Sequence, residues 1–202
     1  MLTLREISCV CTLSAAFVAA ATISGQAQGA PSAQTQGAAG ARESIEATEG
    51  RELLEWDRRI AQMIRRGELK LREEQTSEDG VHHDQWYQQL HKGVRVEGGE
   101  VWRQTQGGTT TALEGTIFTG IALNPVPKLT RDEALTAFRA LTPEGAGPSL
   151  PPELIVLSRS DGTYVLAYRA RIFTNAGATV YALDASTGAE VMREEEAAAP
   201  ER

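Results

Sequence analysis

The segment Tyr87–Val101, YQQLHKGVRVEGGEV, decides the predicted fold of this chain. Apolar and polar residues alternate on both sides of Lys92-Gly93, which predicts two antiparallel strands joined by a tight turn. Val94 and Val96 fall on one face of the second strand. The pair Gly98-Gly99 then interrupts the alternation. Because glycine tolerates the backbone angles of a β-bulge, we expect this strand to change register at the glycine pair.

The regions next to this segment predict a helix and further strands. Over residues 48–67, apolar side chains recur every three or four positions, which indicates a helix with one buried stripe. Gly67 follows the last turn, where glycine often ends a helix. The stripe contains Leu53, Trp56, Ile60, Met63 and Ile64. Alternation and turn residues predict strands over residues 68–77, 84–91, 94–105 and 109–123.

A second helix and a second series of strands follow. Thr130 and Glu133 have the spacing of a capping box at the start of the segment LTRDEALTAFRAL. The expected buried stripe of this helix is Ala134, Leu135, Phe138 and Leu141. Strands are predicted over residues 152–160, 163–173, 178–185 and 186–194. The order helix, strands, helix, strands predicts an α+β fold with two antiparallel-sheet halves, each with a covering helix.

The two ends of the chain differ from this organised region. Residues 1–27 have an apolar run followed by small residues, which predicts a secretory signal peptide; a membrane anchor is the alternative, but the run is short and rich in alanine and serine. Both cysteines, Cys9 and Cys11, lie in it, so the mature chain would have none. Residues 28–47 predict a flexible linker, and residues 197–202 a disordered tail.

Composition and motifs argue against several functions. The net charge of -7 and the pI near 5.1 disfavour a nucleic-acid binder, which needs a basic surface. The three histidines, His82, His83 and His91, do not form an H-E-x-x-H motif, and neighbouring histidines on a strand point to opposite faces. No G-x-S-x-G or phosphate-binding glycine motif occurs. We therefore assign no catalytic, cofactor-binding or metal-ligating residue, and expect a binding role.

Two stretches resemble a known family. YQQLHKGVRVEGGEV resembles the fungalysin/thermolysin propeptide (FTP) motif, and YVLAYRARIFTNAGATVYALDASTGAEVMRE resembles the PepSY-like half of the same propeptides. The first match is carried by Tyr87, Gln89, Gly93, Val94, Val96, Gly98 or Gly99, and Glu100. The second is carried by Leu166, Ala167, Tyr168, Tyr181, Asp184, Ala185, Thr187 and Gly188. Asp84 and Trp86 depart from the pattern, which often has histidine and arginine there, and Leu183 replaces a valine.

The resemblance implies an FTP-like half over residues 48–127 and a PepSY-like half over residues 128–196. It implies a non-catalytic exported module that binds a secreted zinc metallopeptidase of the thermolysin type as inhibitor, folding chaperone or both, in trans or in cis within a longer precursor. The candidate partner contacts are the motif residues Tyr87, Gln89, Gly93, Val94, Val96, Gly99, Glu100, Tyr168, Tyr181, Asp184, Thr187 and Gly188. A truncated metallopeptidase precursor and an envelope-associated PepSY-like binding domain are the alternatives. The expected location is periplasmic or extracellular, without stable membrane insertion after signal cleavage.

Overall fold

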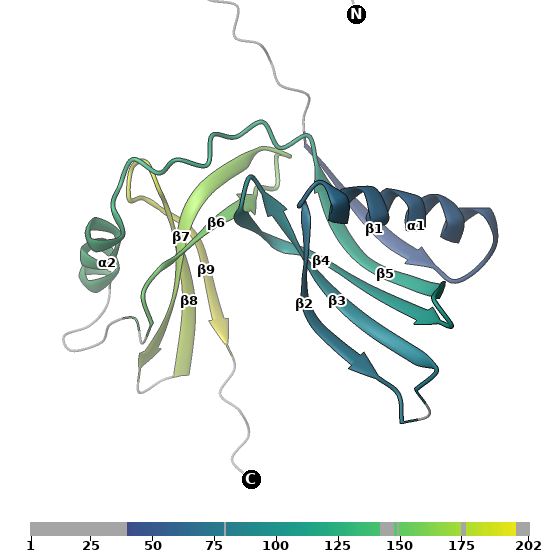
Figure 1. Cartoon of the computed structure of the whole chain (residues 1–202). Coiled ribbons are helices and arrows are strands. Elements are labelled where there is room, and N and C mark those ends of the chain that lie inside the picture. Colours follow the sequence, from purple (N-terminus) through teal and green to yellow (C-terminus); the bar gives the residue numbers. More distant parts are fainter. Residues whose placement is uncertain (1–39, 79, 142–147, 149, 175–176, 197–202) are drawn as a thin grey trace, which may run out of the picture. The chain divides into compact units, whose positions relative to one another are not determined.

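The computed structural model describes residues 40–78, 80–141, 148, 150–174 and 177–196 (Figure 1). The predicted signal peptide, residues 28–39 of the predicted linker and the predicted tail lie outside these ranges. The first elements are β1 (Ala41–Ala47), α1 (Gly50–Arg65), β2 (Leu69–Thr76), β3 (His82–His91), β4 (Val94–Gln106) and β5 (Thr109–Thr119). The later elements are α2 (Arg131–Ala140), β6 (Glu153–Ser158), β7 (Tyr164–Thr174), β8 (Gly177–Asp184) and β9 (Glu190–Glu196). Both predicted helices and all eight predicted strands are confirmed.

Strand β1 corrects the predicted linker, because residues 41–47 of that linker pair with β5. The register runs from Ala41 opposite Thr119 to Ala47 opposite Leu113. The Ile45 and Ala47 side chains on this strand are buried against α1. Composition indicated a flexible segment here, because most of residues 28–47 are small or polar. The few apolar residues at its end suffice to add one strand to an existing sheet edge.

The strands form one connected sheet rather than two separate ones. The sheet order is β1-β5-β4-β6-β7-β8-β9, and β3 pairs with β4 and carries β2. Every pairing is antiparallel except that of β4 with β6, which is parallel and places Arg95 opposite Ile155 and Val96 opposite Val156. The α+β class is confirmed, and this short parallel contact joins the strands of residues 41–119 to those of residues 153–196.

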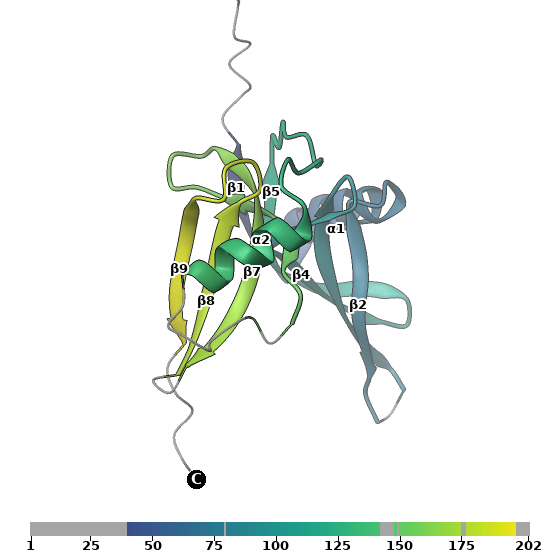
Figure 2. The same ribbon diagram turned by 90° about the vertical axis from the view of Figure 1, so that its left-hand side faces the viewer.

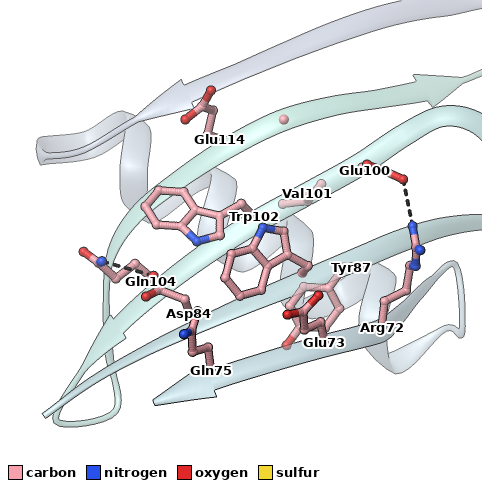
Figure 3. A pocket seen from close by; sticks show the side chains of 12 residues that line it. Arg72, Glu73, Gln75, Asp84, Tyr87, Glu100, Val101, Trp102, Gln104 and Glu114 are labelled. Atoms are coloured by element: carbon pink, nitrogen blue, oxygen red, sulfur yellow. Dashed lines mark hydrogen bonds and ion pairs between the residues drawn. The ribbon is translucent and has the colours of Figure 1, made fainter. Parts of the chain in front are cut away.

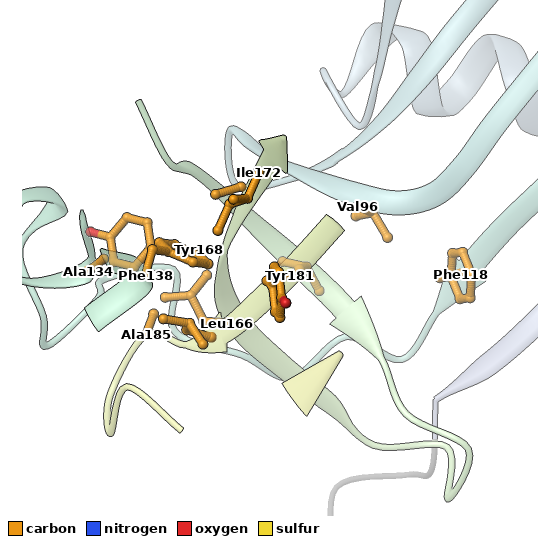
Figure 4. Close-up of a cluster of buried hydrophobic side chains, with 12 residues drawn as sticks. Val96, Phe118, Ala134, Phe138, Leu166, Tyr168, Ile172, Tyr181 and Ala185 are labelled. Carbon is orange, nitrogen blue, oxygen red and sulfur yellow. The ribbon is translucent and has the colours of Figure 1, made fainter. Parts of the chain in front are cut away.

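Each helix covers a hydrophobic core, and the two cores lie on opposite faces of the sheet. We call the first the α1 core; it contains Ile45, Ala47, Leu53, Ile60, Met63, Leu69, Tyr87, Val101, Leu113 and Ile117. The second, the α2 core, contains Val96, Phe118, Ala134, Phe138, Val156, Leu166, Tyr168, Ala170, Ile172, Tyr181, Leu183 and Ala185 (Figure 4). Ile117 and Phe118 are neighbours on β5 and point to opposite faces. One strand therefore contributes to both cores.

The helix termini follow the local signals in the sequence. Gly67 adopts a left-handed conformation (φ 71°) directly after the end of α1. At the start of α2, the Thr130 hydroxyl accepts a hydrogen bond from the Glu133 amide, and the Glu133 carboxylate accepts one from the Thr130 amide at 2.7 Å. The prediction for Leu141 is wrong: it is 43% exposed, because α2 ends at Ala140. Figure 2 shows α2 lying across β7 and β8.

Candidate functional site

The predicted bulge lies in β4, at the glycine pair. Gln88 on β3 is opposite Glu100, whereas Leu90, two residues later, is opposite Arg95. Residues 96–99 of β4 therefore face a single residue of β3, Gln89. Gly98 has a φ of 71°, which a residue with a side chain adopts only with strain. The register change predicted from the glycine pair is confirmed.

The side chain of Gln89 replaces a missing stretch of backbone pairing. Its amide nitrogen donates to the Phe118 carbonyl at 2.6 Å, and its amide oxygen accepts from the Phe118 N–H at 2.8 Å. Gly99 makes room for this side chain, because a Cβ at that position would lie 2.7 Å from Gln89 Oε1. The Gln89 amide thus takes the place of a backbone peptide group, and it connects β3 to β5 across the bulge of β4.

A second glutamine, Gln88, donates hydrogen bonds to carbonyl groups within the bulge. Gln88 Nε2 donates to the Val96 carbonyl at 2.9 Å and to the Gly99 carbonyl at 2.8 Å. Both glutamines are 4% exposed, so each bond is shielded from water. Sequence reasoning identified Gln89 from the resemblance but missed Gln88. The available signal was a pair of amide side chains between the apolar residues Tyr87 and Leu90, on the strand that pairs with the glycine-containing one.

Many of the candidate contact residues have internal roles. The buried side chains among them are Tyr87, Gln89, Val96, Tyr168 and Tyr181, and Gly99 is buried as well. Val94 is half-buried and packs against the α2 core, and Gly93 forms the β3–β4 turn with a φ of 88°. Glu100 is exposed and pairs with Arg72 at 3.0 Å. Contact with a partner stays a prediction for these residues.

The remaining candidates form the turn between β8 and β9. Asp184 Oδ1 accepts hydrogen bonds from the amides of Ser186 and Thr187 at 2.7 and 3.0 Å. Gly188 takes a φ of 75°. Close to this turn, the Tyr168 hydroxyl donates to the Leu129 carbonyl at 2.9 Å, and burial raises the pKa of that phenol. Asp184 and Gly188 therefore fix this turn.

The three histidines are not brought together as a site. His83 Nδ1 lies 3.1 Å from the Thr76 hydroxyl, and His91 Nε2 lies 2.9 Å from the Leu123 carbonyl. His91 is half-buried. Within the described ranges, no group of three or more histidine, cysteine, aspartate or glutamate side chains has an arrangement suited to a metal ion.

A concave surface lies on the sheet face opposite α1. Tyr87 and Val101 point into the α1 core, so their neighbours Trp86 and Trp102 point to the other face. The two tryptophans are opposite each other across β3 and β4 and are half-buried. They line an open hollow of about 720 Å³ (Figure 3). Sequence reasoning noted Trp86 only as a departure and missed the pair.

Charged and amide groups surround the two indoles. We call this surface the Trp face; it consists of Glu73, Asp84, Trp86, Trp102, Gln104 and Glu114. Arg72 and Glu100 form the ion pair noted above at its edge, and Gln104 Nε2 donates to Asp84 Oδ1 at 3.1 Å (Figure 3). Aromatic surface and carboxylates in an open hollow favour binding by stacking and charge.

Comparisons with known proteins agree with part of the resemblance. Residues 67–117 match the family model of the Fungalysin/Thermolysin Propeptide Motif. This range is about a quarter of the chain and includes β2, β3, β4, the bulge and most of β5. The propeptide resemblance is thus supported for these residues, and the PepSY-like assignment of residues 128–196 stays a prediction.

Among solved structures, the chain is similar to the Bacillus megaterium YpeB C-terminal domain, with a TM-score of 0.39 and 14% sequence identity. The alignment covers 76% of this chain and 68% of that one. No curated protein matches the sequence. Neither of the two described helices is long and apolar enough to cross a membrane.

Proposed function

We propose that this chain is a propeptide-type module that binds a thermolysin-type metallopeptidase and inhibits it, assists its folding, or both, without catalysing a reaction itself. The observation that carries the proposal is the match of residues 67–117 to the propeptide motif. The two halves named in the sequence analysis, with the PepSY-like one over residues 128–196, are part of this proposal.

The construction of the matched region supports a binding role. The glutamine pair and the glycine pair hold β3, β4 and β5 together through buried hydrogen bonds. A sheet held in this way is formed before it meets a partner, so less conformational entropy is lost on binding. Its open face carries two tryptophans, a residue type that is enriched where protein interfaces are strongest.

The proposed setting is outside the cytoplasm, in the periplasm or the medium, after removal of residues 1–27 as a signal peptide. The partner is a secreted zinc metallopeptidase, met in trans or held in cis within a longer precursor. Two alternatives come from the sequence: the chain is the N-terminal part of such a precursor, or it is an envelope-associated domain with another ligand. A reading frame that continues to an H-E-x-x-H motif would identify the cis arrangement.

The direct test is inhibition of a thermolysin-type peptidase by the purified chain. The rate of cleavage of a fluorogenic peptide should fall as the chain is added at micromolar concentrations, and the chain should remain intact on a gel. A serine endopeptidase under the same conditions should be unaffected. In parallel, the chain should raise the yield of active peptidase recovered after denaturation. If neither inhibition nor improved refolding occurs at micromolar concentrations, the proposal is wrong.

A further inference from the structure

The Trp face has an ordered arrangement that the match to the propeptide motif does not explain. One row of side chains crosses four adjacent strands. Glu73 on β2 is opposite Trp86 on β3, which is opposite Trp102 on β4, and Trp102 is opposite Glu114 on β5. The two indoles therefore lie side by side, with the carboxylates of Glu73 and Glu114 on either side of them, and Glu46 on β1 is opposite Glu114. The next row on the same face contains Asp84 opposite Gln104.

The charge of this face is not neutralised within the described part of the chain. The residues that line the hollow include four carboxylates, those of Glu73, Asp84, Glu100 and Glu114, and one guanidinium, that of Arg72. Arg72 is already paired with Glu100. Over the described ranges, no lysine, arginine or histidine forms an ion pair with any of the other three carboxylates.

Two other aromatic rings that are exposed or half-buried, those of Trp56 and Phe173, show what the Trp face lacks. The guanidinium of Arg59 lies 4.8 Å from the ring centroid of Trp56, and that of Arg171 lies 4.9 Å from the ring of Phe173. Such stacking is favourable because the face of an aromatic ring attracts a cation. Within the described ranges, neither Trp86 nor Trp102 has a cation over its ring. The Trp face therefore presents two aromatic rings on which a cation from another molecule can stack.

We propose that the Trp face binds a segment of the partner protein that presents arginine or lysine. The cationic group stacks on the indoles of Trp86 and Trp102 and forms ion pairs with Glu73 and Glu114. The hollow is wide and open, whereas a small-molecule site encloses most of its ligand, so a protruding protein segment fits it better. This inference rests on the proposed function in one respect, which is that the partner protein is a metallopeptidase.

A peptide titration tests the face without any peptidase. Tetra-arginine is added to the purified full chain, and the indole N–H resonances of the three tryptophans are followed by NMR, with assignment through a Trp56→Phe variant. The resonances of Trp86 and Trp102 should shift saturably. Tetra-citrulline, which has the same shape without the charge, should leave them unchanged.

Matched charge variants show whether the carboxylates of this face matter. The double variant Glu73→Gln/Glu114→Gln should bind tetra-arginine about fivefold more weakly, because two exposed ion-pair partners are lost. The control Glu52→Gln/Glu55→Gln makes the same change in net charge beside Trp56, where Arg59 already lies, and should bind like the parent chain. All four glutamates are exposed, so both variants should fold, which circular dichroism verifies.

The outcomes separate this inference from the proposed function. Equal weakening in both double variants, equal binding of tetra-citrulline, or shifts confined to Trp56 would overturn the inference. So would free arginine amide binding as tightly as the peptide, since that indicates a small-molecule site. Inhibition of the peptidase with no peptide binding would overturn the inference alone. Peptide binding as described without inhibition or folding assistance would overturn the proposed function alone.

Discussion

Replacing Gln89 with leucine tests the central structural argument, that one side-chain amide completes the backbone pairing of β5. Leucine occupies a similar volume but cannot exchange hydrogen bonds with the N–H and carbonyl of Phe118. Both bonds are buried, at 2.8 and 2.6 Å, and Gln89 is 4% exposed. A buried polar group without a partner costs about 1–3 kcal/mol. Two such groups, offset in part by the more apolar side chain, predict a loss of about 2–4 kcal/mol in the free energy of unfolding.

The measurement is urea unfolding followed by tryptophan fluorescence. We expect the midpoint of Gln89→Leu to fall while the slope stays unchanged, as for a purely energetic change. The control is Gln106→Leu, which makes the same substitution at an exposed position at the end of β4 and should alter the free energy by less than about 0.5 kcal/mol. If Gln89→Leu lies within about 0.5 kcal/mol of the parent chain, the reasoning about this glutamine is refuted.

Three further predictions follow from the same structure. Gly99→Ala should destabilise the fold by about 1–3 kcal/mol, because its Cβ would lie 2.7 Å from Gln89 Oε1, and this loss should be smaller when it is measured in a Gln89→Ala background. Thr130→Ala removes the capping hydroxyl of α2 and should cost about 1 kcal/mol, measured by urea unfolding. Glu43→Gln should have a lower free energy of unfolding than the parent chain at neutral pH, and this difference should disappear at acidic pH. The reason is that hydrogen bonds from Arg59 lower the pKa of Glu43 from its usual 4.5, so this stabilisation is complete above pH 4.5 and is lost as the pH falls through the lowered pKa.

Each of these predictions has an outcome that contradicts it. Alanine at position 89 removes Oε1 but keeps the Cβ, which would lie 2.9 Å from the added methyl group, so equal effects of Gly99→Ala in both backgrounds would mean that the amide group of Gln89 is not the main obstacle. The control for the helix cap is Thr136→Ala in the middle of α2, where the hydroxyl donates to the Asp132 carbonyl and alanine favours the helix; a loss as large as that of Thr130→Ala would remove the capping argument. For Glu43, a stability difference that is unchanged between pH 7 and pH 3 would exclude the ion pair with Arg59 as its source.

Much of the local structure could be predicted because its signals are close together in the sequence. The capping box needs only residues three apart, and the hairpin turn at Lys92-Gly93 needs only two. The bulge follows from the conformational freedom of Gly98. The candidate contacts were harder to predict, since a motif identifies residues without indicating whether they are buried. Tyr87, Tyr168 and Tyr181 belong to the motif and lie in the cores.

The sequence by itself determined the α+β class, both helices and eight of the nine strands of the described residues, and the bulge in β4, because periodicity, caps and turn glycines act over a few residues. Only the tertiary structure decided that residues 41–47 add a strand, that β4 and β6 pair in parallel, and that Gln89 reaches Phe118 across an intervening strand. It also decided that Trp86 and Trp102 lie side by side, next to the carboxylates of Glu73 and Glu114, which form no ion pair within the described ranges. These features depend on burial and strand register between residues far apart in the chain, which local patterns do not specify.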